Sequence, residues 1–363
     1  MAAPATGGET AGAAAEAPGG GAAGGGPPEV VTFGEAMGLM LADDGLPLRR
    51  ARRFHRTLAG AELNTAVGLA RLGHRAAYAG RVGDDPFGEE VRATLLAEGV
   101  DAAGLRVDPD APTGLLTRDR DGHRRIRVVY HRAGNAGSRL TPEDLAALPL
   151  AGARLLHVTG ITPALSESAR AATLAAVRAA RDAGVTVSFD PNLRTKLWSR
   201  EQAAPVLREL AASAQIVLTS EEEGAWLAGL AEPGADDADR GAADADRGAN
   251  DALARIAAYF HEAGAQIVVI KRGAEGARVS EAGGDAVDVP ALPVGAVVDP
   301  VGAGDAFDAG FLSGWLGGLP PAEAARRGAA CGAAVVQVAG DLEGLPTRAE
   351  LEDLMSETTE VDR

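Results

Sequence analysis

The chain has 363 residues, 46% of them hydrophobic, so it can bury one large core, with or without an appendage. Its 51 acidic residues outnumber 35 basic ones, and the net charge of −16 argues against nucleic acid and anionic membranes as general partners. Cys331 is the single cysteine, which excludes an intramolecular disulfide. We therefore expect a reducing, cytoplasmic location, with Cys331 packed in the core.

Residues 1–28 consist almost wholly of Ala, Gly, Pro, Glu and Thr. They lack the basic start and apolar run of a signal peptide, and their composition predicts a disordered tail. No apolar stretch approaches the about 20 residues that a membrane-spanning helix needs. We expect a folded domain over residues 29–355 and no membrane partner.

Short β-branched runs alternate with helical patterns through most of that domain, which predicts an α/β fold with a mostly parallel sheet. Strands are expected at 29–34, 76–81, 154–159, 185–190, 215–219 and 266–271. Helices are expected at 61–73, 87–98, 166–183, 200–213, 251–263, 303–317 and 321–339. Ligands of such sheets bind at the carboxyl ends of the strands, where this chain carries its polar clusters.

Three segments interrupt the alternation. Residues 37–58 and 111–133 are rich in Arg and Thr, and the second reads as a hairpin around Asp121-Gly122. Together they predict a small sheet outside the main domain, which would be a lid or a dimer surface. Residues 231–250 contain an acidic near repeat without apolar periodicity, which predicts a solvated loop insertion.

Near the C-terminus, Val298 to Phe307 form a turn of small residues followed by an apolar helix. Gly302 and Gly304 would let the backbone approach an anion, the helix start adds unpaired N–H donors, and Asp305 would lie within reach of the same anion. The segment alone equally fits a glycine turn with Asp305 as a helix-start residue. It is neither a dinucleotide fingerprint nor a Walker A loop, which needs Gly-Lys-Ser/Thr.

Other polar residues stand at predicted element ends and also allow two interpretations. The run Gly60 to Asn64 would suit close ligand approach or simple helix capping. Arg132 and Arg194 could clamp a carboxylate or a phosphate, or be solvated arginines. Glu223 could hold hydrated Mg²⁺ or cap a helix, and the loop 271–276 could be a plain hairpin turn or face a nucleotide.

In combination these motifs are far more specific than any one of them. Their order resembles that of the ribokinase-like (phosphofructokinase-B type) carbohydrate kinases over roughly residues 29–350, and the motifs are Gly60…Asn64, Gly80-x-Val82-Gly83-Asp84, Asp190-Pro191-Asn192, Ser220-x-x-Glu223, Lys271-x-Gly273-x-x-Gly276 and Asp299-x-x-Gly302-Ala303-Gly304-Asp305. The resemblance implies a three-layer α/β/α sandwich with a mostly parallel central sheet and a small β lid. Segments 157–166, 192–199 and 341–344 resemble the branch that phosphorylates the sugar acid 2-keto-3-deoxygluconate.

The resemblance also implies residue roles. Asp305 would be the general base that takes the proton of the terminal 6-hydroxyl, and Gly302, Ala303 and Gly304 would form the anion hole. The sugar acid would be bound by Gly60, Ala61, Glu62, Leu63, Asn64, Tyr130, Arg132, Arg194, Asp305 and Asp341. The nucleotide would be bound by Asn192, Arg194, Arg272, Gly273, Glu275, Gly276, Ala277, Gly302, Ala303, Gly304 and Asp305.

The implied co-substrate is ATP with Mg²⁺, for which Glu223 is the candidate ligand through water; a monovalent cation is a further candidate, and a homo-oligomer is expected by analogy. Ser220 stands where the family usually has Asn, and His131 lies in a lid segment that is usually more aromatic. Two other functions remain open. One is a fructokinase or ribokinase acting on a neutral sugar, and the other is a catalytically silent sugar-acid sensor.

Overall fold

The fold was obtained as a computed structural model that describes residues 26–43, 46–120, 126–230 and 242–360. Most of the expected tail, the hairpin tip Asp121-Gly122 and residues 231–241 of the expected insertion lie outside the described residues. Within the described part, no helix is long and apolar enough to cross a membrane.

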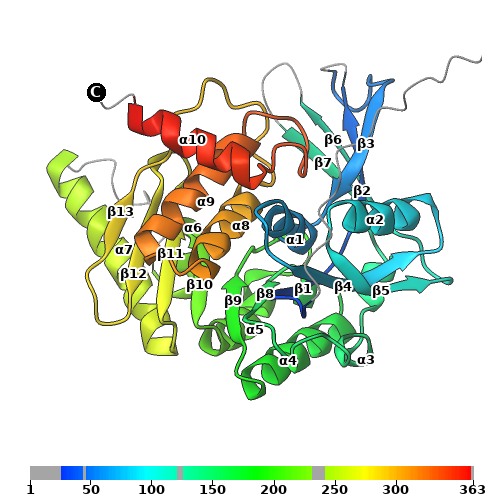
Figure 1. Cartoon of the computed structure of the whole chain (residues 1–363), viewed down its shortest axis with the longest axis horizontal. Helices are drawn as coiled ribbons and strands as arrows, with labels where there is room; N and C mark the ends of the chain where they lie inside the picture. The colour runs from blue at the N-terminus through cyan, green and yellow to red at the C-terminus, as the bar shows by residue number, and fades with distance from the viewer. Residues whose placement is uncertain (1–25, 44–45, 121–125, 231–241, 361–363) are drawn as a thin grey trace, which may run out of the picture.

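A nine-stranded sheet forms the centre of the molecule, in the order β13-β12-β11-β10-β9-β8-β1-β4-β5 (Figure 1). All neighbours pair in parallel except β12 with β11 and with β13, which are antiparallel. Its strands are β1 Val30–Phe33, β4 Ala76–Gly83, β5 Asp101–Asp108, β8 Leu155–Thr159, β9 Thr186–Asp190, β10 Ile216–Ser220, β11 Ile267–Lys271, β12 Ala277–Glu281 and β13 Val287–Val289. The six expected strands are confirmed; β5, β12 and β13 are additions at the two edges.

Helices cover both faces of this sheet and give the predicted three layers. They are α1 Ala61–Arg71, α2 Pro86–Ala97, α3 Pro142–Leu145, α4 Glu167–Asp182, α5 Arg200–Ser213, α6 Glu221–Leu227, α7 Ala242–Ala263, α8 Ala303–Leu316, α9 Pro321–Val335 and α10 Arg348–Glu360. One hydrophobic core joins the sheet to α1, α2, α8, α9 and α10, and a second joins it to α3 through α7. Cys331 lies buried in α9 within the first core, as expected.

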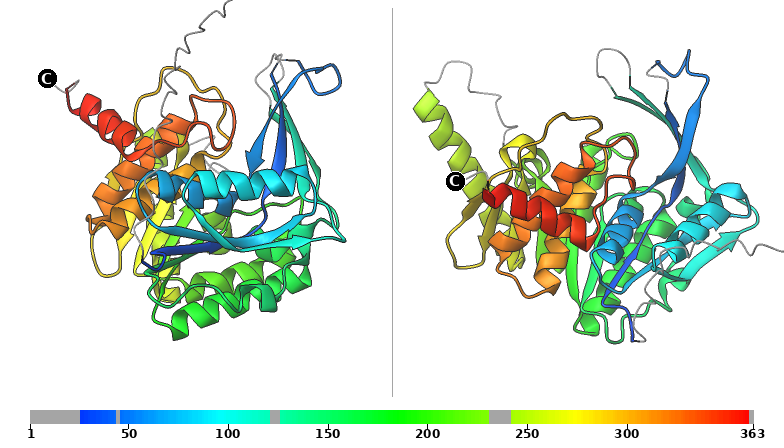
Figure 2. Two further views of the ribbon diagram at one scale, coloured as in Figure 1. Left: turned by 45° about the vertical axis from the view of Figure 1, so that its right-hand side comes forward. Right: turned by 45° about the horizontal axis from the view of Figure 1, so that its top comes forward.

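The two interrupted segments form a separate sheet of four strands, β3-β2-β6-β7, which confirms the expected small sheet. Its strands are β2 Met37–Ala42, β3 Phe54–Ala59, β6 Gly114–Arg120 and β7 Ile126–His131. Met37, Leu39 and Leu116 make a small hydrophobic cluster on one of its faces. Figure 2 shows this sheet standing beyond the three layers, beside α2. We call it the lid sheet.

Two boundaries differ from the sequence prediction. Helix α7 begins at Ala242, so residues 242–250 of the expected loop insertion are helical; the acidic residues mask an amphipathic pattern that starts before residue 251. Helix α9 ends at Val335, earlier than the expected residue 339. The run 336–339 has no breaker of its own, and the chain leaves the helix there to approach the 298–299 turn, whose N–H groups both donate to the carbonyl of Val336.

The topology places the polar residues together at one end of the large sheet. Strand β1 lies between β8 and β4, so the chain reverses its direction of propagation across the sheet at β1. The crevice outside such a reversal point is the usual ligand site of parallel sheets. Glu35, Thr159, Asp190 and Lys271 all stand at or just beyond the carboxyl ends of their strands at this crevice.

Candidate active site

Asp305 lies in the first turn of α8, directly after the glycine turn. Gly302 precedes the helix with a φ of 83°, a left-handed conformation that glycine adopts without strain. The Asp305 carboxylate accepts a hydrogen bond of 2.8 Å from Asn64 Nδ2 and lies 3.5 Å from Asn192 Nδ2. Burial raises the pKa of Asp305 to about 6, although Asn64 and Arg194 favour its charged form. A carboxylate with such a pKa is suited to accept a proton near neutral pH.

Close packing of α1 against α8 brings Asn64 to Asp305. A Cβ added to Gly68 would lie 2.7 Å from the Cβ of Ala309, closer than two carbon atoms can pack. Gly68 stands one turn after Asn64 on α1, and Ala309 stands one turn after Asp305 on α8. The glycine therefore sets the helix separation at which the amide can reach the carboxylate.

The other residues from Gly60 to Leu63 pack against, or hydrogen-bond to, other parts of the protein. Gly60 has a φ of 153°, and a Cβ there would lie 2.4 Å from the carbonyl oxygen of Glu35. Glu62 is buried and accepts hydrogen bonds of 2.7 Å from the hydroxyls of Thr159 and Thr162. Burial raises the pKa of Glu62 to about 7. Ala61 is buried and Leu63 belongs to the hydrophobic core, so the side chain of Leu63 packs rather than faces a ligand.

Tyr130 lies on strand β7 of the lid sheet, and Arg132 directly follows that strand. The Arg132 guanidinium forms an ion pair with the buried carboxylate of Glu35, just beyond β1, and lies 5.3 Å from the centre of the Tyr130 ring. Lys196 approaches the same ring from the main domain, with Nζ 5.7 Å from its centre. Arg194, on the same loop as Lys196, is exposed and lowers the pKa of Asp305. Glu35 and Lys196 were not predicted from the sequence as site residues.

The expected nucleotide loop is a hairpin between β11 and β12. Gly276 has a φ of 89°, and a Cβ there would lie 2.0 Å from the carbonyl oxygen of Val289, so only glycine fits. Arg272 pairs with Glu275 and lies 3.5 Å from Glu221, at the start of α6. Gly273 and Glu275 are exposed, whereas Ala277 is buried at the start of β12.

Lys271 stands beside the glycine turn and was missed as a site residue. Its Nζ lies 2.9 Å from carboxylate oxygens of both Asp190 and Asp308, and a Cβ on Gly304 would lie 3.7 Å from Nζ. Burial disfavours the lysine charge, but the two carboxylates more than offset this and raise the pKa of Lys271. This buried group ties the ends of β9 and β11 to the first turns of α8.

Arg118, on strand β6 of the lid sheet, is a third cation that was not predicted from the sequence as a site residue. It is buried, with Nη1 2.7 Å from Asp341 Oδ1 and Nη2 2.9 Å from Asp299 Oδ2. Asp341 in turn lies 3.4 Å from Asn64 Nδ2. Arg118 stands two residues after the buried Leu116 on β6, so both side chains lie on the same face of the strand, and Leu116 pairs with Tyr130 of β7 on that face. This two-residue spacing is the sequence signal that could have identified Arg118 as inward-facing.

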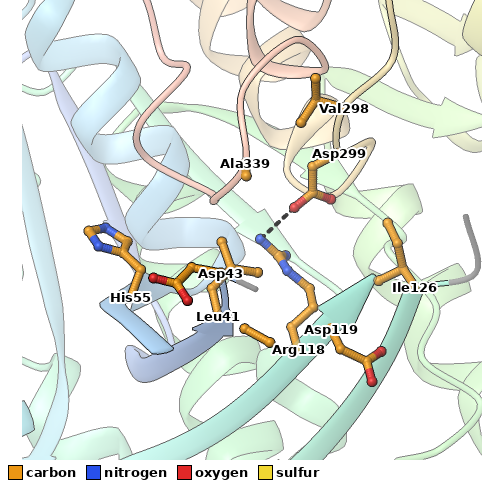
Figure 3. A pocket seen from close by; sticks show the side chains of 10 residues that line it. Leu41, Asp43, His55, Arg118, Asp119, Ile126, Val298, Asp299 and Ala339 are labelled. Carbon is orange, nitrogen blue, oxygen red and sulfur yellow. Dashed lines mark ion pairs between the residues drawn. The ribbon is translucent and has the colours of Figure 1, made fainter. Parts of the chain in front are cut away.

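A cavity of about 420 Å³ opens beside Arg118, between the lid sheet and the turn at Asp299 (Figure 3). Its lining includes the polar side chains Asp43, His55 and Asp119. Figure 3 shows Arg118 reaching from β6 across this cavity toward Asp299.

Glu223, the candidate metal residue, is held by the protein. Its Oε1 accepts a 2.7 Å hydrogen bond from the backbone N–H of Leu193, and its Oε2 accepts one of 2.7 Å from the Ser220 hydroxyl. The Ser220 hydroxyl also accepts from the backbone of Glu223, so the pair caps α6. No group of three His, Cys, Asp or Glu side chains among the described residues is arranged to hold a metal ion.

A family model for the pfkB family of carbohydrate kinases matches residues 27–348. The chain belongs to this family. The kinase is 38% identical to the 2-dehydro-3-deoxygluconokinase of Bacillus subtilis (strain 168) over 331 residues, which are 90% of this chain and 95% of that protein. It is also 37% identical to a fructokinase of Klebsiella pneumoniae over 301 residues, which are 81% of this chain and 90% of that protein.

The fold is shared with solved structures of the family. The crystal structure of 2-dehydro-3-deoxygluconokinase from Thermotoga maritima matches this kinase with a TM-score of 0.77 and 28% sequence identity, covering 90% of this chain and 99% of that one. The expected ribokinase-like fold, with its central sheet, two helical layers and small second sheet, is thereby confirmed.

Proposed function

We propose that this sugar kinase transfers a phosphoryl group from ATP to the terminal 6-hydroxyl of 2-keto-3-deoxygluconate. The observation that carries the proposal is the buried Asp305 at the start of α8, adjacent to the left-handed glycine turn and hydrogen-bonded by Asn64. The identity to the B. subtilis 2-dehydro-3-deoxygluconokinase over most of both chains supports the substrate.

In this proposal Asp305 is the general base and the glycine turn is the anion hole. Asp305 accepts the proton as the hydroxyl oxygen attacks the γ-phosphorus in line, and negative charge spreads over the transferring group. The N–H groups of Gly302, Ala303 and Gly304 belong to the first turn of α8 or precede it, so no carbonyl of that helix satisfies them. In the proposal the N–H groups of Gly302 and Gly304 donate to the phosphate. The N–H of Ala303 makes a long hydrogen bond of 3.4 Å to the carbonyl of Pro300, which the phosphate would replace.

The substrate carboxylate would be recognised by Arg194, with Tyr130 and the Asn64 and Asp341 pair contacting the rest of the sugar acid. Arg132 contributes less charge than the sequence indicated, because Glu35 already pairs with it. Arg194 forms no ion pair with another of the described residues, and it is exposed near Asp305, whose pKa it lowers. The nucleotide would lie between Asn192 and the Arg272 to Ala277 hairpin.

Mg²⁺ fits this site as an ion held mainly by the nucleotide. It binds few protein carboxylates and keeps several waters, so the absence of a preformed carboxylate cluster among the described residues is compatible with it. Glu223 would reach it through water, because both carboxylate oxygens already accept protein hydrogen bonds. When bound, Mg²⁺ neutralises the developing charge on the phosphates. The monovalent cation and the homo-oligomer remain predictions.

A coupled assay of ADP production with a panel of sugars tests the substrate. We expect 2-keto-3-deoxygluconate to give the highest kcat/KM, with its galactonate epimer, fructose and ribose as the comparison. Higher kcat/KM with fructose than with the sugar acid would contradict the proposal.

The second candidate is a fructokinase. Two observations favour it: the 37% identity to the K. pneumoniae fructokinase, and the ion pair by which Glu35 neutralises Arg132. A neutral ketohexose would need no cation at the site. The same sugar panel separates the two candidates.

A further inference from the structure

We propose that Arg118 is a positioning residue that couples docking of the lid sheet to alignment of the base Asp305. The inference rests on the proposed role of Asp305 as base. It concerns a residue that does not itself touch Asp305 but reaches it through two intervening side chains.

Arg118 is a buried ion-pair contact between the lid sheet and the catalytic end of the main domain. It lies on β6, and its side chain is buried, whereas arginine is almost never fully buried unless it is paired. Both partners, Asp299 and Asp341, belong to the main domain, more than 180 residues further along the chain. Figure 3 shows the guanidinium crossing from β6 to Asp299.

Each carboxylate that pairs with Arg118 also contacts a group next to Asp305 or the glycine turn. Asp341 accepts from Arg118 through Oδ1 at 2.7 Å, and its Oδ2 lies 3.4 Å from Asn64 Nδ2, which also donates to Asp305 at 2.8 Å. Asp299 Oδ1 accepts a 3.1 Å hydrogen bond from the backbone N–H of Val301, one residue before Gly302. Arg118 therefore acts on the base through Asp341 and on the glycine turn through Asp299.

The electrostatics make this arrangement depend on the lid. Burial raises the pKa of Asp341, the Arg118 charge lowers it, and the nearby Asp299 charge raises it again. With Arg118 withdrawn, two buried carboxylates would face each other without a cation between them. Asp341 would then bind the Asn64 amide more strongly, or take up a proton, and either change shifts the amide that orients Asp305. The base is consequently aligned when the lid sheet is docked.

Arg118→Met tests the coupling, because methionine fills a similar volume without the charge. We expect kcat to fall about tenfold or more while the KM for ATP changes less than about twofold, because binding groups remain and alignment is lost. Arg118→Lys should recover part of kcat, since the ammonium keeps the positive charge but lacks the planar, two-pronged donor geometry of the guanidinium.

Arg81→Met is the matched control. Arg81 also joins two carboxylates, with 3.1 Å to Asp108 and 2.7 Å to Asp144, but on β4 and away from Asp305. We expect it to lower thermal stability and to leave kcat per folded molecule unchanged. Hydrogen exchange supplies a second readout: Arg118→Met should speed exchange of β6 and β7 amides, and Arg81→Met should not.

Wild-type kcat in Arg118→Met, or unaltered exchange in the lid sheet, would overturn the inference. So would equal losses of kcat in the Arg118 and Arg81 variants. If Arg118→Met does not fold, the Arg118→Lys comparison decides, with unchanged kcat as the contrary result. Failure of the proposed function would look different: the wild type would prefer another sugar, on which the same variants are then compared, or Asp305→Asn would keep full turnover.

Discussion

Two cations, the buried Arg118 and the partly buried Lys271, flank Asp305, and each bridges a pair of aspartates, but they connect different parts of the molecule. Lys271 joins Asp190 and Asp308, all within the main domain, so its contacts persist wherever the lid sheet lies. Arg118 joins Asp299 and Asp341 from the separate lid sheet, so its contacts exist only when that sheet is docked. A cation between two aspartates thus stabilises the main domain at all times in the case of Lys271. In the case of Arg118 the same kind of contact depends on the position of the lid sheet.

Lys271→Met would sharpen this comparison most, because it should act on stability. Removing the ammonium leaves Asp190 and Asp308 buried without their cation, which should lower the free energy of unfolding by about 3–5 kcal/mol. Denaturant unfolding would measure it. Lys196→Met is the matched control, since Lys196 is the other lysine of the chain and is exposed, and it should change stability by less than about 0.5 kcal/mol. Equal stability of the two variants would break the distinction.

Asp305→Asn acts on the group that the two cations flank. The amide keeps the shape but cannot accept the proton, so turnover should fall at least about a hundredfold, equivalent to about 2.7 kcal/mol of barrier. Affinity for ATP and for the sugar acid should remain, as measured by calorimetry. Near-normal turnover would remove Asp305 from the role of base.

The pH dependence of activity and stability should run in opposite directions at Asp305. Its pKa in the folded protein is about 6, against 3.8 for the unperturbed group, so kcat/KM should rise with pH through about 6. Ionisation of a group whose folded pKa is raised costs stability, so that contribution is lost as pH rises from about 4 through 6. Asp305→Asn should therefore be more stable than the wild type at pH 7, by about 1–3 kcal/mol. An acidic limb near pH 4 would contradict this.

Arg194→Met should have the smallest of these effects. Loss of an exposed cation at the crevice should raise the KM for 2-keto-3-deoxygluconate about tenfold and leave the KM for a neutral sugar unchanged. It should also move the acidic limb to higher pH, because Arg194 lowers the pKa of Asp305. Arg178→Met, on the exposed face of α4, is the control and should alter neither quantity.

The main sheet was predictable because several of its strands, such as β10 and β11, are short runs rich in β-branched residues and buried on both faces. The edge strand β5 was not, because only every third residue of it is buried, namely Ala102, Leu105 and Asp108, and this spacing does not match the two-residue period of a strand. The place of Gly302, Gly304 and Asp305 at the start of an apolar helix was predictable from local spacing. Glu35 and Arg118 were not, because their importance comes from partners 97 and 223 residues away, and no local pattern records such pairings.

The contact between Gly68 and Ala309 bears on how this kinase can change through mutation. Helices α1 and α8 touch at two successive turns: Asn64 contacts Asp305, and one turn later Gly68 contacts Ala309. A methyl group added at Gly68 would push the two helices apart and lengthen the distance between Asn64 and Asp305. The proton-accepting step therefore depends on Gly68, which has no polar side chain. A survey of variants that looks only at charged residues would overlook Gly68, although a neutral, conservative exchange to alanine there would misplace the base without touching it.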